Sequence, residues 1–131
     1  MTVEKINPPG LPVPIGYTQV VASRGTRTVY VAGQVAVDAI GNVVAPGDVV
    51  GQASRAFANV RSAVTAAGGT VADIVKVTWY VVGYRPEMLP ALAQARRDIF
   101  GAHEPASTLV GVAALANPHY LVEVEAIAVM D

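Results

Sequence analysis

Near its C-terminus the sequence reads LVEVEAIAV over residues 121–129. Its two glutamates occupy alternate positions, and the remaining residues are apolar. Successive side chains of a β-strand point to opposite faces of a sheet. One face of this strand would therefore carry Leu121, Glu123, Glu125, Ile127 and Val129, and the other Val122, Val124, Ala126 and Ala128. We predict a strand with one wholly apolar face and a second face on which two carboxylates lie among apolar neighbours.

Glu123 and Glu125 would stand roughly 7 Å apart on that second face, the spacing of alternate strand residues. A partly buried pair of this kind costs on the order of several kcal/mol unless cations or hydrogen-bond donors compensate it. In one interpretation, one glutamate is a general base that positions or deprotonates a water molecule. In the other, the pair is a solvated or structural feature of the strand, and spacing alone leaves both open.

Upstream of this strand, runs rich in β-branched residues predict further strands over residues 17–23, 26–37, 74–82 and 107–113. Arg24-Gly25 separates the first two runs and indicates a β-hairpin. Ile40-Gly41-Asn42 indicates a turn, because glycine and asparagine tolerate positive φ. The nearly continuous apolar run over residues 74–82 is typical of a central strand.

A helical period begins after Asp48, a residue type that caps helices at their first turn, and Gly68-Gly69 marks the end. Its apolar face would carry Val49, Ala53, Phe57, Val60 and Val64, with Gln52, Arg55 and Asn59 placed elsewhere. A second helix is predicted over residues 86–100, with Pro86 near its start and Gly101 at its end.

The predicted order is therefore β-β-α-β-α-β-β in one domain over residues 1–131, an α+β two-layer sandwich with both helices on one face of the sheet. The composition is 53% hydrophobic and only 15% charged, against about 25% charged in typical soluble domains. Some apolar surface is therefore expected between subunits, with another copy of the chain covering the second face of the sheet. A solution mass near 13.5 kDa would count against such a homo-oligomer.

Charge and composition exclude several classes of function. The net charge is −1, with no run of like charges, so neither nucleic-acid nor membrane binding is expected. The chain has no cysteine, which fits a reducing compartment, and its N-terminus lacks the pattern of a signal peptide, so we expect a cytoplasmic protein. His103 and His119 have no Asp or Cys at ligand spacing, and no phosphate-binding loop is present, so we expect no metal and no cofactor.

Several short segments, in order along nearly the whole chain, resemble the RidA (YjgF) family of reactive-intermediate deaminases. They are Gly16-Tyr17-Thr18-Gln19, Gly33-Gln34, Asn59-Val60, Ala67-Gly68-Gly69, Asp73 to Thr78, and the closing strand Val122 to Val129. The resemblance implies a chorismate-mutase-like fold and a homotrimer whose sheets form an internal barrel. It also implies small-molecule clefts between neighbouring subunits.

The resemblance also implies candidate site residues. Family members that hydrolyse 2-imino acids hold the substrate carboxylate with an arginine and a water molecule near a glutamate. Glu123 matches that glutamate, and Tyr17 and Gly33 match other cleft positions. The arginine position is occupied by Ser107, within Pro105-Ala106-Ser107-Thr108. Three further cleft positions that are polar in the family carry Ala32, Ala93 and Leu109.

A neutral serine cannot replace a guanidinium in binding a carboxylate, so an ordinary 2-imino acid is not the expected substrate. Arg24, Arg27, Arg85, Arg96 and Arg97 are each expected to be solvated surface charges rather than substitutes. The favoured hypothesis is hydrolysis of another imine, enamine or related reactive metabolite, with Glu123 as the catalytic residue. The alternative is a non-catalytic module that binds a metabolite or protects another protein and has lost deaminase activity.

Overall fold

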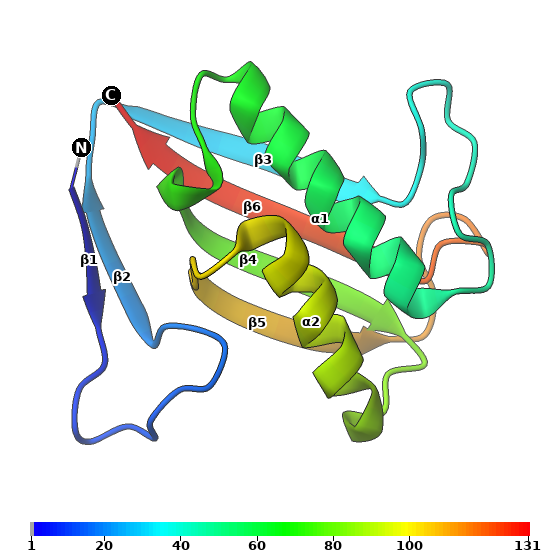
Figure 1. The fold of residues 1–131 in the computed structure, drawn as a ribbon, viewed down its shortest axis with the longest axis horizontal. Coiled ribbons are helices and arrows are strands. Elements are labelled where there is room, and N and C mark those ends of the chain that lie inside the picture. Colours follow the sequence, from blue (N-terminus) through cyan, green and yellow to red (C-terminus); the bar gives the residue numbers. More distant parts are fainter. Residues whose placement is uncertain (1) are drawn as a thin grey trace.

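The computed structural model describes residues 2–131, which form two sheets and two α-helices (Figure 1). The small sheet pairs β1 (Thr2–Ile6) with β2 (Val20–Arg24). The main sheet has the strand order β3 (Arg27–Val35), β6 (Val122–Met130), β4 (Ile74–Val82) and β5 (Ala106–Val112). The helices are α1 (Val49–Ala66) and α2 (Leu89–Phe100), and short 3₁₀ turns cover Val71–Asp73 and Pro86–Met88.

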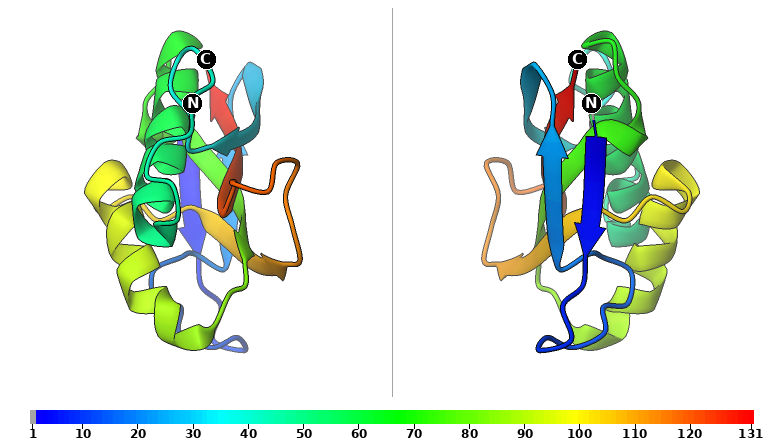
Figure 2. Two further views of the ribbon diagram at one scale, coloured as in Figure 1. Left: turned by 90° about the vertical axis from the view of Figure 1, so that its right-hand side faces the viewer. Right: turned by 90° about the vertical axis from the view of Figure 1, so that its left-hand side faces the viewer.

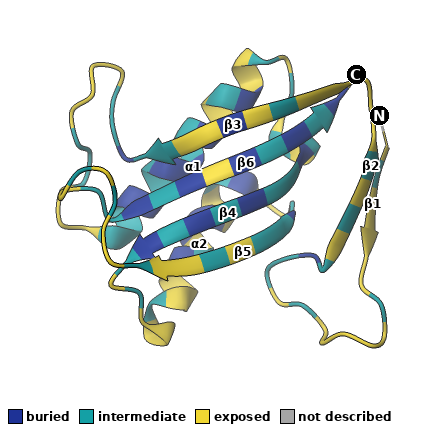
Figure 3. Cartoon of the chain, turned by 180° about the vertical axis from the view of Figure 1, so that it is seen from behind, coloured by how far each residue is buried: buried dark blue, intermediate teal, exposed yellow. Residues whose placement is uncertain are grey.

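Both helices cover the same face of the main sheet, and the other face is left open (Figures 2 and 3). The alternation expected at the C-terminus holds, since Val122, Val124 and Ala126 are buried beneath the helices while Glu123 and Glu125 point to the open face. Phe57 of α1 packs edge-on against Trp79 of β4 and Phe100 of α2, with ring centroids 5.1 and 5.2 Å apart. The predicted two-layer α+β architecture is confirmed.

The prediction that residues 17–23 and 26–37 form a β-hairpin is wrong. β2 pairs instead with β1, a strand that was not expected, and β3 pairs with β6. Gly25 lies between them, where an added Cβ would come within 2.8 Å of the carbonyl oxygen of Met130. The chain therefore changes direction against the end of β6 at Gly25, so β2 pairs with the preceding strand β1 and β3 pairs with the distant strand β6.

The predicted bounds of the first helix are confirmed. The Asp48 carboxylate accepts a hydrogen bond from the backbone N–H of Gly51 at 3.0 Å, and Gly68 follows the helix with a φ of +94°. Gln52 departs from the expectation because it is fully buried on the core side of α1. The amide nitrogen of Gln52 donates to the carbonyl oxygen of Ala45 at 3.3 Å and to that of His119 at 3.1 Å. Its amide oxygen accepts from the N–H of Leu121 at 2.9 Å. Gln52 thus ties α1 to the loop that leads into β6.

Replacing Gln52 by leucine is expected to lower the free energy of unfolding by about 1–3 kcal/mol, because buried backbone groups lose their partners. Urea unfolding followed by circular dichroism measures the change. The matched control is Gln94→Leu on α2, where the glutamine is exposed and the expected change is within about 0.5 kcal/mol. Equal effects of the two substitutions would contradict a structural role for the Gln52 amide.

No helix within residues 2–131 combines the length and the apolar character needed to cross a lipid bilayer.

Candidate functional site

A cavity of about 650 Å³ lies between α2 and the edge strand β5, a size suited to a small-molecule ligand. The register of the main sheet explains its β5 wall. Ser107 and Leu109 are paired with Val77 and Trp79, whose side chains face the helices, so both β5 side chains point toward α2. The cavity is lined by Ile15, Gly16, Tyr17, Trp79, Pro86, Leu89, Pro90, Ala93, Arg96, Arg97, Ser107 and Leu109. We call it the α2–β5 pocket.

Four of the expected site residues meet in this pocket, namely Tyr17, Ala93, Ser107 and Leu109. Tyr17 is held in place by its neighbours. The hydroxyl of Thr18 donates to the carbonyl oxygen of Glu104 at 2.6 Å, and the Thr18 N–H donates to the carbonyl oxygen of Pro105 at 3.2 Å. These bonds tie the segment that carries Tyr17 to the start of β5.

Arg96 corrects one expectation from the sequence. Its side chain lines the α2–β5 pocket and is only 2% exposed, and neither Nη1 nor Nη2 has a hydrogen-bond partner among the described residues. Burial lowers the pKa of this guanidinium from its usual value, an effect that the charge of Glu104 partly opposes and that of Arg97 reinforces. A buried cation therefore borders the pocket that was expected to have none.

The other arginines considered from the sequence are exposed, as expected. Arg97 lines the same pocket, but its Nη2 donates to Gln94 Oε1 at 2.9 Å. Arg85 pairs with Glu87 at 3.1 Å, and Arg27 donates to the carbonyl oxygen of Ala67 at 3.1 Å. Of these arginines, all within residues 2–131, Arg96 alone is both buried and without a hydrogen-bond partner for its terminal nitrogens.

The sequence did contain a signal for the burial of Arg96. Leu92, Arg96 and Phe100 are spaced four residues apart, so they form one stripe along α2, and all three are buried. A cation on the apolar stripe of a helix is unusual. Helical spacing could therefore have distinguished Arg96 from Arg97, which lies one position further along and faces solvent.

Glu123 lies on the open face of the main sheet, away from the α2–β5 pocket. It is half-buried and paired in register with Val35 of β3 and Tyr80 of β4. Its carboxylate lies over Gly33, where an added Cβ would overlap Oε1. Gly33 falls at the irregularity of β3 between Val31 and Gln34, and the lack of a side chain there leaves room for the Glu123 carboxylate.

Glu125 occupies a different environment on the same face. The hydroxyl of Tyr80 donates to Glu125 Oε1 at 2.7 Å, and this bond raises the pKa of Tyr80. Glu125 also borders a hollow of about 430 Å³ that includes the expected site residue Ala32, together with Lys76 and Thr78. The two glutamates are therefore distinct, since Glu125 is bound by a tyrosine while Glu123 rests against a glycine.

The expected site residues thus divide into two groups. Tyr17, Ala93, Ser107 and Leu109 line the α2–β5 pocket on the helix side, whereas Ala32, Gly33 and Glu123 belong to the open face. The main sheet separates the two groups, so a ligand in the pocket cannot touch Glu123 of the same chain. A single site that uses both groups requires two copies of the chain.

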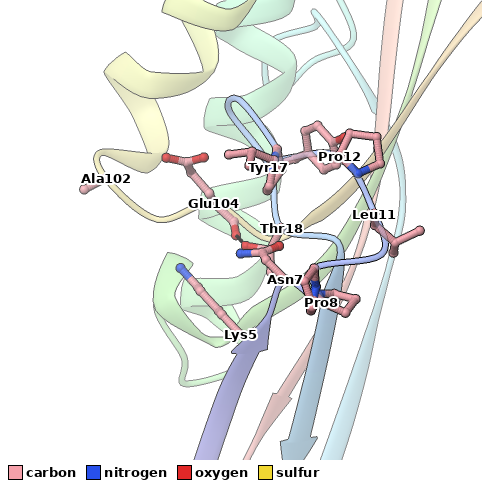
Figure 4. Close-up of a pocket in the computed structure, with 12 residues that line it drawn as sticks. Lys5, Asn7, Pro8, Leu11, Pro12, Tyr17, Thr18, Ala102 and Glu104 are labelled. Atoms are coloured by element: carbon pink, nitrogen blue, oxygen red, sulfur yellow. Dashed lines mark hydrogen bonds between the residues drawn. The ribbon is translucent and has the colours of Figure 1, made fainter.

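A second cavity, of about 610 Å³, lies between the proline-rich segment after β1 and the residues that follow α2 (Figure 4). Lys5 and Glu104 contribute its charges, and Tyr17 lines both this cavity and the α2–β5 pocket. No other expected site residue borders it. We therefore regard the α2–β5 pocket as the candidate ligand site.

No group of three or more His, Asp or Glu side chains that could hold a metal ion occurs within residues 2–131. His103 instead has a structural contact, because its Nε2 lies 2.7 Å from the carbonyl oxygen of Ile74. Burial lowers the pKa of His103.

Comparisons with known proteins identify relatives of this chain. The chain is 33% identical over 127 residues to a 2-iminobutanoate/2-iminopropanoate deaminase of Dermatophagoides farinae, covering 96% of this chain and 95% of that protein. A Rid-family protein of unknown function from Yersinia pestis, YyfB, superposes with a TM-score of 0.92 at 36% identity, covering 98% and 99% of the two chains. TdcF of E. coli, solved with bound serine, matches with a TM-score of 0.68 at 31% identity, covering 98% and 99%. The family model described as endoribonuclease L-PSP matches residues 11–130, and the chain therefore belongs to this family, the RidA (YjgF) family.

Proposed function

We propose that this protein hydrolyses an imine, an enamine or a related reactive metabolite in clefts between neighbouring copies of a cytoplasmic homotrimer. The observation that carries the proposal is the division of the expected site between the two faces of the main sheet. When the open face of one copy meets the α2–β5 pocket of the next, Glu123 and Tyr17 face a common ligand. The similarity to a 2-iminobutanoate/2-iminopropanoate deaminase supports the type of chemistry.

The surface of the main sheet supports assembly through its open face. Tyr30 on β3 is 77% exposed and Val110 on β5 is 37% exposed, and both belong to this face. The low charge content of the chain is a second argument, since only 15% of residues are charged. Apolar and hydrogen-bonding side chains on a sheet face are suited to contact with another copy.

The proposed reaction adds water to the C=N bond. Glu123 takes a proton from a water molecule as its oxygen attacks the imine carbon. Glu123 gives this proton to the nitrogen, which completes the neutral carbinolamine. Glu123 then carries the hydroxyl proton of the carbinolamine to the nitrogen, the C–N bond breaks, and ammonia leaves as the carbonyl forms. Glu123 ends unprotonated, and the overall change is imine plus water to ketone or aldehyde plus ammonia. An enamine enters the same route once its carbon is protonated to give the imine.

Ser107 makes 2-imino acids poor substrates in this proposal. A substrate carboxylate attached to the imine carbon would meet the serine at the β5 wall, where the family's arginine is missing. Losing a charge-assisted, two-pronged contact costs about 1.5–3 kcal/mol, or roughly 10- to 100-fold in binding. Ala32, Ala93 and Leu109 further reduce the polarity of the cleft. We therefore propose a substrate other than an ordinary 2-imino acid.

The test is an assay of ammonia release from a panel of imines generated in solution, with and without a carboxylate on the imine carbon. We expect hydrolysis above the uncatalysed rate for imines that lack this carboxylate, and less acceleration for the imines of simple 2-oxo acids. The reverse preference would contradict the proposed substrate class. A uniform lack of acceleration would contradict the hydrolytic function.

The second candidate function is a non-catalytic module that binds a metabolite or protects another protein. The observation in its favour is the replacement of several polar cleft groups by Ala32, Ala93, Ser107 and Leu109. A ligand that binds only the folded state raises the melting temperature whether or not it reacts. A melting temperature raised by panel compounds that are not turned over would favour this function over hydrolysis.

A further inference from the structure

We propose that Arg96 is a relocated anion anchor, so that the α2–β5 pocket binds a small molecule through a carboxylate or similar oxyanion held from the α2 wall. The inference rests on the proposed function only in identifying this pocket as the ligand site. Anion binding itself requires no turnover. It refines the substrate class to an apolar molecule whose negative group is directed toward α2 rather than toward Ser107 on β5.

The Arg96 side chain is buried without a partner within residues 2–131. It is 98% buried, and both terminal nitrogens lack a hydrogen-bond partner among the described residues. Arginine stays protonated in proteins, so the group remains a cation. A buried cation without a partner is strongly destabilising unless something compensates it, and such groups require an explanation. Both nitrogens are also covered from solvent, so an anionic ligand that reaches them from the pocket would supply the missing partner.

Gly16 and apolar side chains surround the guanidinium of Arg96. Gly16 has a φ of +81°, and a Cβ at this position would lie 3.4 Å from Arg96 Nη2. A side chain at residue 16 would therefore pack against the guanidinium, and the positive φ favours glycine, which makes no such contact. Nη1 and Nη2 are the pair of nitrogens that can bind both oxygens of a carboxylate. Because Trp79 and Leu109 contribute apolar walls, the attraction is less screened there than in water.

Neighbouring charges do not satisfy this need within the described part of the chain. Glu104 affects Arg96 through its charge, but it forms no hydrogen bond with Nη1 or Nη2. Arg97 borders the same pocket, yet it is exposed and bound to Gln94, so water and a neighbour already satisfy it. The two adjacent arginines therefore have different roles, with Arg96 facing the ligand and Arg97 lying at the rim.

Benzoate and benzamide form a suitable pair of probes, because they differ in charge but scarcely in shape. We expect calorimetric titration of the wild-type protein to show benzoate binding at least about tenfold more tightly than benzamide. In Arg96→Met, benzoate affinity should fall by about 10- to 100-fold while benzamide affinity is unchanged. Arg61→Met, an equal change of charge at an exposed position of α1, should behave like the wild type.

Stability provides an independent readout, since a purely structural arginine would behave in the opposite way. Without ligand, Arg96→Met should melt at a higher temperature than the wild type, because an unpartnered buried charge is replaced by an apolar side chain. A lower melting temperature with unchanged benzoate affinity would show that Arg96 is structural and overturn the proposal. Equal wild-type affinities for benzoate and benzamide would also overturn it, even if Arg96→Met failed to fold.

The outcomes separate this inference from the proposed function. Charge-selective binding that depends on Arg96, together with no hydrolysis of any imine, would support the anchor and reject the hydrolase. Hydrolysis with no preference for benzoate over benzamide would support the hydrolase and reject the anchor.

Discussion

Replacing Glu123 by glutamine is expected to lower kcat for imine hydrolysis by about 100-fold or more, the usual contribution of a general base. Glutamine keeps the size of the side chain and its contact with Gly33, but it cannot accept the proton of the attacking water. The release of ammonia at saturating imine measures kcat. Because the change alters a proton acceptor and leaves the α2–β5 pocket intact, we expect ligand affinity to change much less than kcat.

Glu125→Gln is the matched control for Glu123→Gln. The two glutamates lie on the same face of β6, but Glu125 already accepts a hydrogen bond from the hydroxyl of Tyr80. A glutamine carbonyl can accept the same bond, so a rate close to that of the wild type is expected. If both substitutions reduced kcat equally, the loss of negative charge on this face would explain the effect, and proton transfer to Glu123 would not.

Gly33→Ala tests the position of the same carboxylate without removing it. An added Cβ would overlap Glu123 Oε1, so the carboxylate must move aside. We expect kcat to fall although the titratable group is still present. A fully active Gly33→Ala protein would show that the observed position of Glu123 does not matter for the reaction.

Phe57→Ala is expected to lower the free energy of unfolding by about 3–5 kcal/mol, the range for deleting a buried aromatic side chain. Phe57 is fully buried in α1, and its ring contacts both Trp79 and Phe100 edge-on. The substitution therefore removes contacts that join α1, α2 and the main sheet. Urea unfolding gives the stability change, and the fluorescence of Trp79, the single tryptophan of the chain, reports loosening around the cavity.

Ile40→Ala is the control for that deletion. Ile40 is 83% exposed in the turn after β3, so its truncation should change stability by no more than about 0.5 kcal/mol. A small effect of Phe57→Ala, comparable to that of Ile40→Ala, would mean that the aromatic cluster does not hold the two layers together.

The elements that the sequence predicted well are those whose signal is local. α1 begins after its Asp48 cap and ends before Gly68, and β4 has the predicted bounds. The alternating C-terminal strand also has the predicted faces, because the two-residue period of a strand depends only on backbone geometry. By contrast, the predicted hairpin after residue 17 was wrong. Strands adjacent in sequence usually pair, and β2 does pair with β1, but Gly25 at the end of β6 redirects the chain so that β3 pairs with β6 rather than with β2.

The candidate site shows the same division between local and long-range information. From residue identities alone, one could expect that Ser107 leaves the β5 wall neutral and that Glu123 and Glu125 share a face. The packing of α2 on the sheet was needed to bury Arg96 beside the α2–β5 pocket, and strand pairing was needed to give the two glutamates different neighbours. The periodicity of the sequence predicts which face of a helix or strand a residue occupies. The groups that the residue contacts on that face come from chain segments far away in sequence, so only the tertiary structure identifies them.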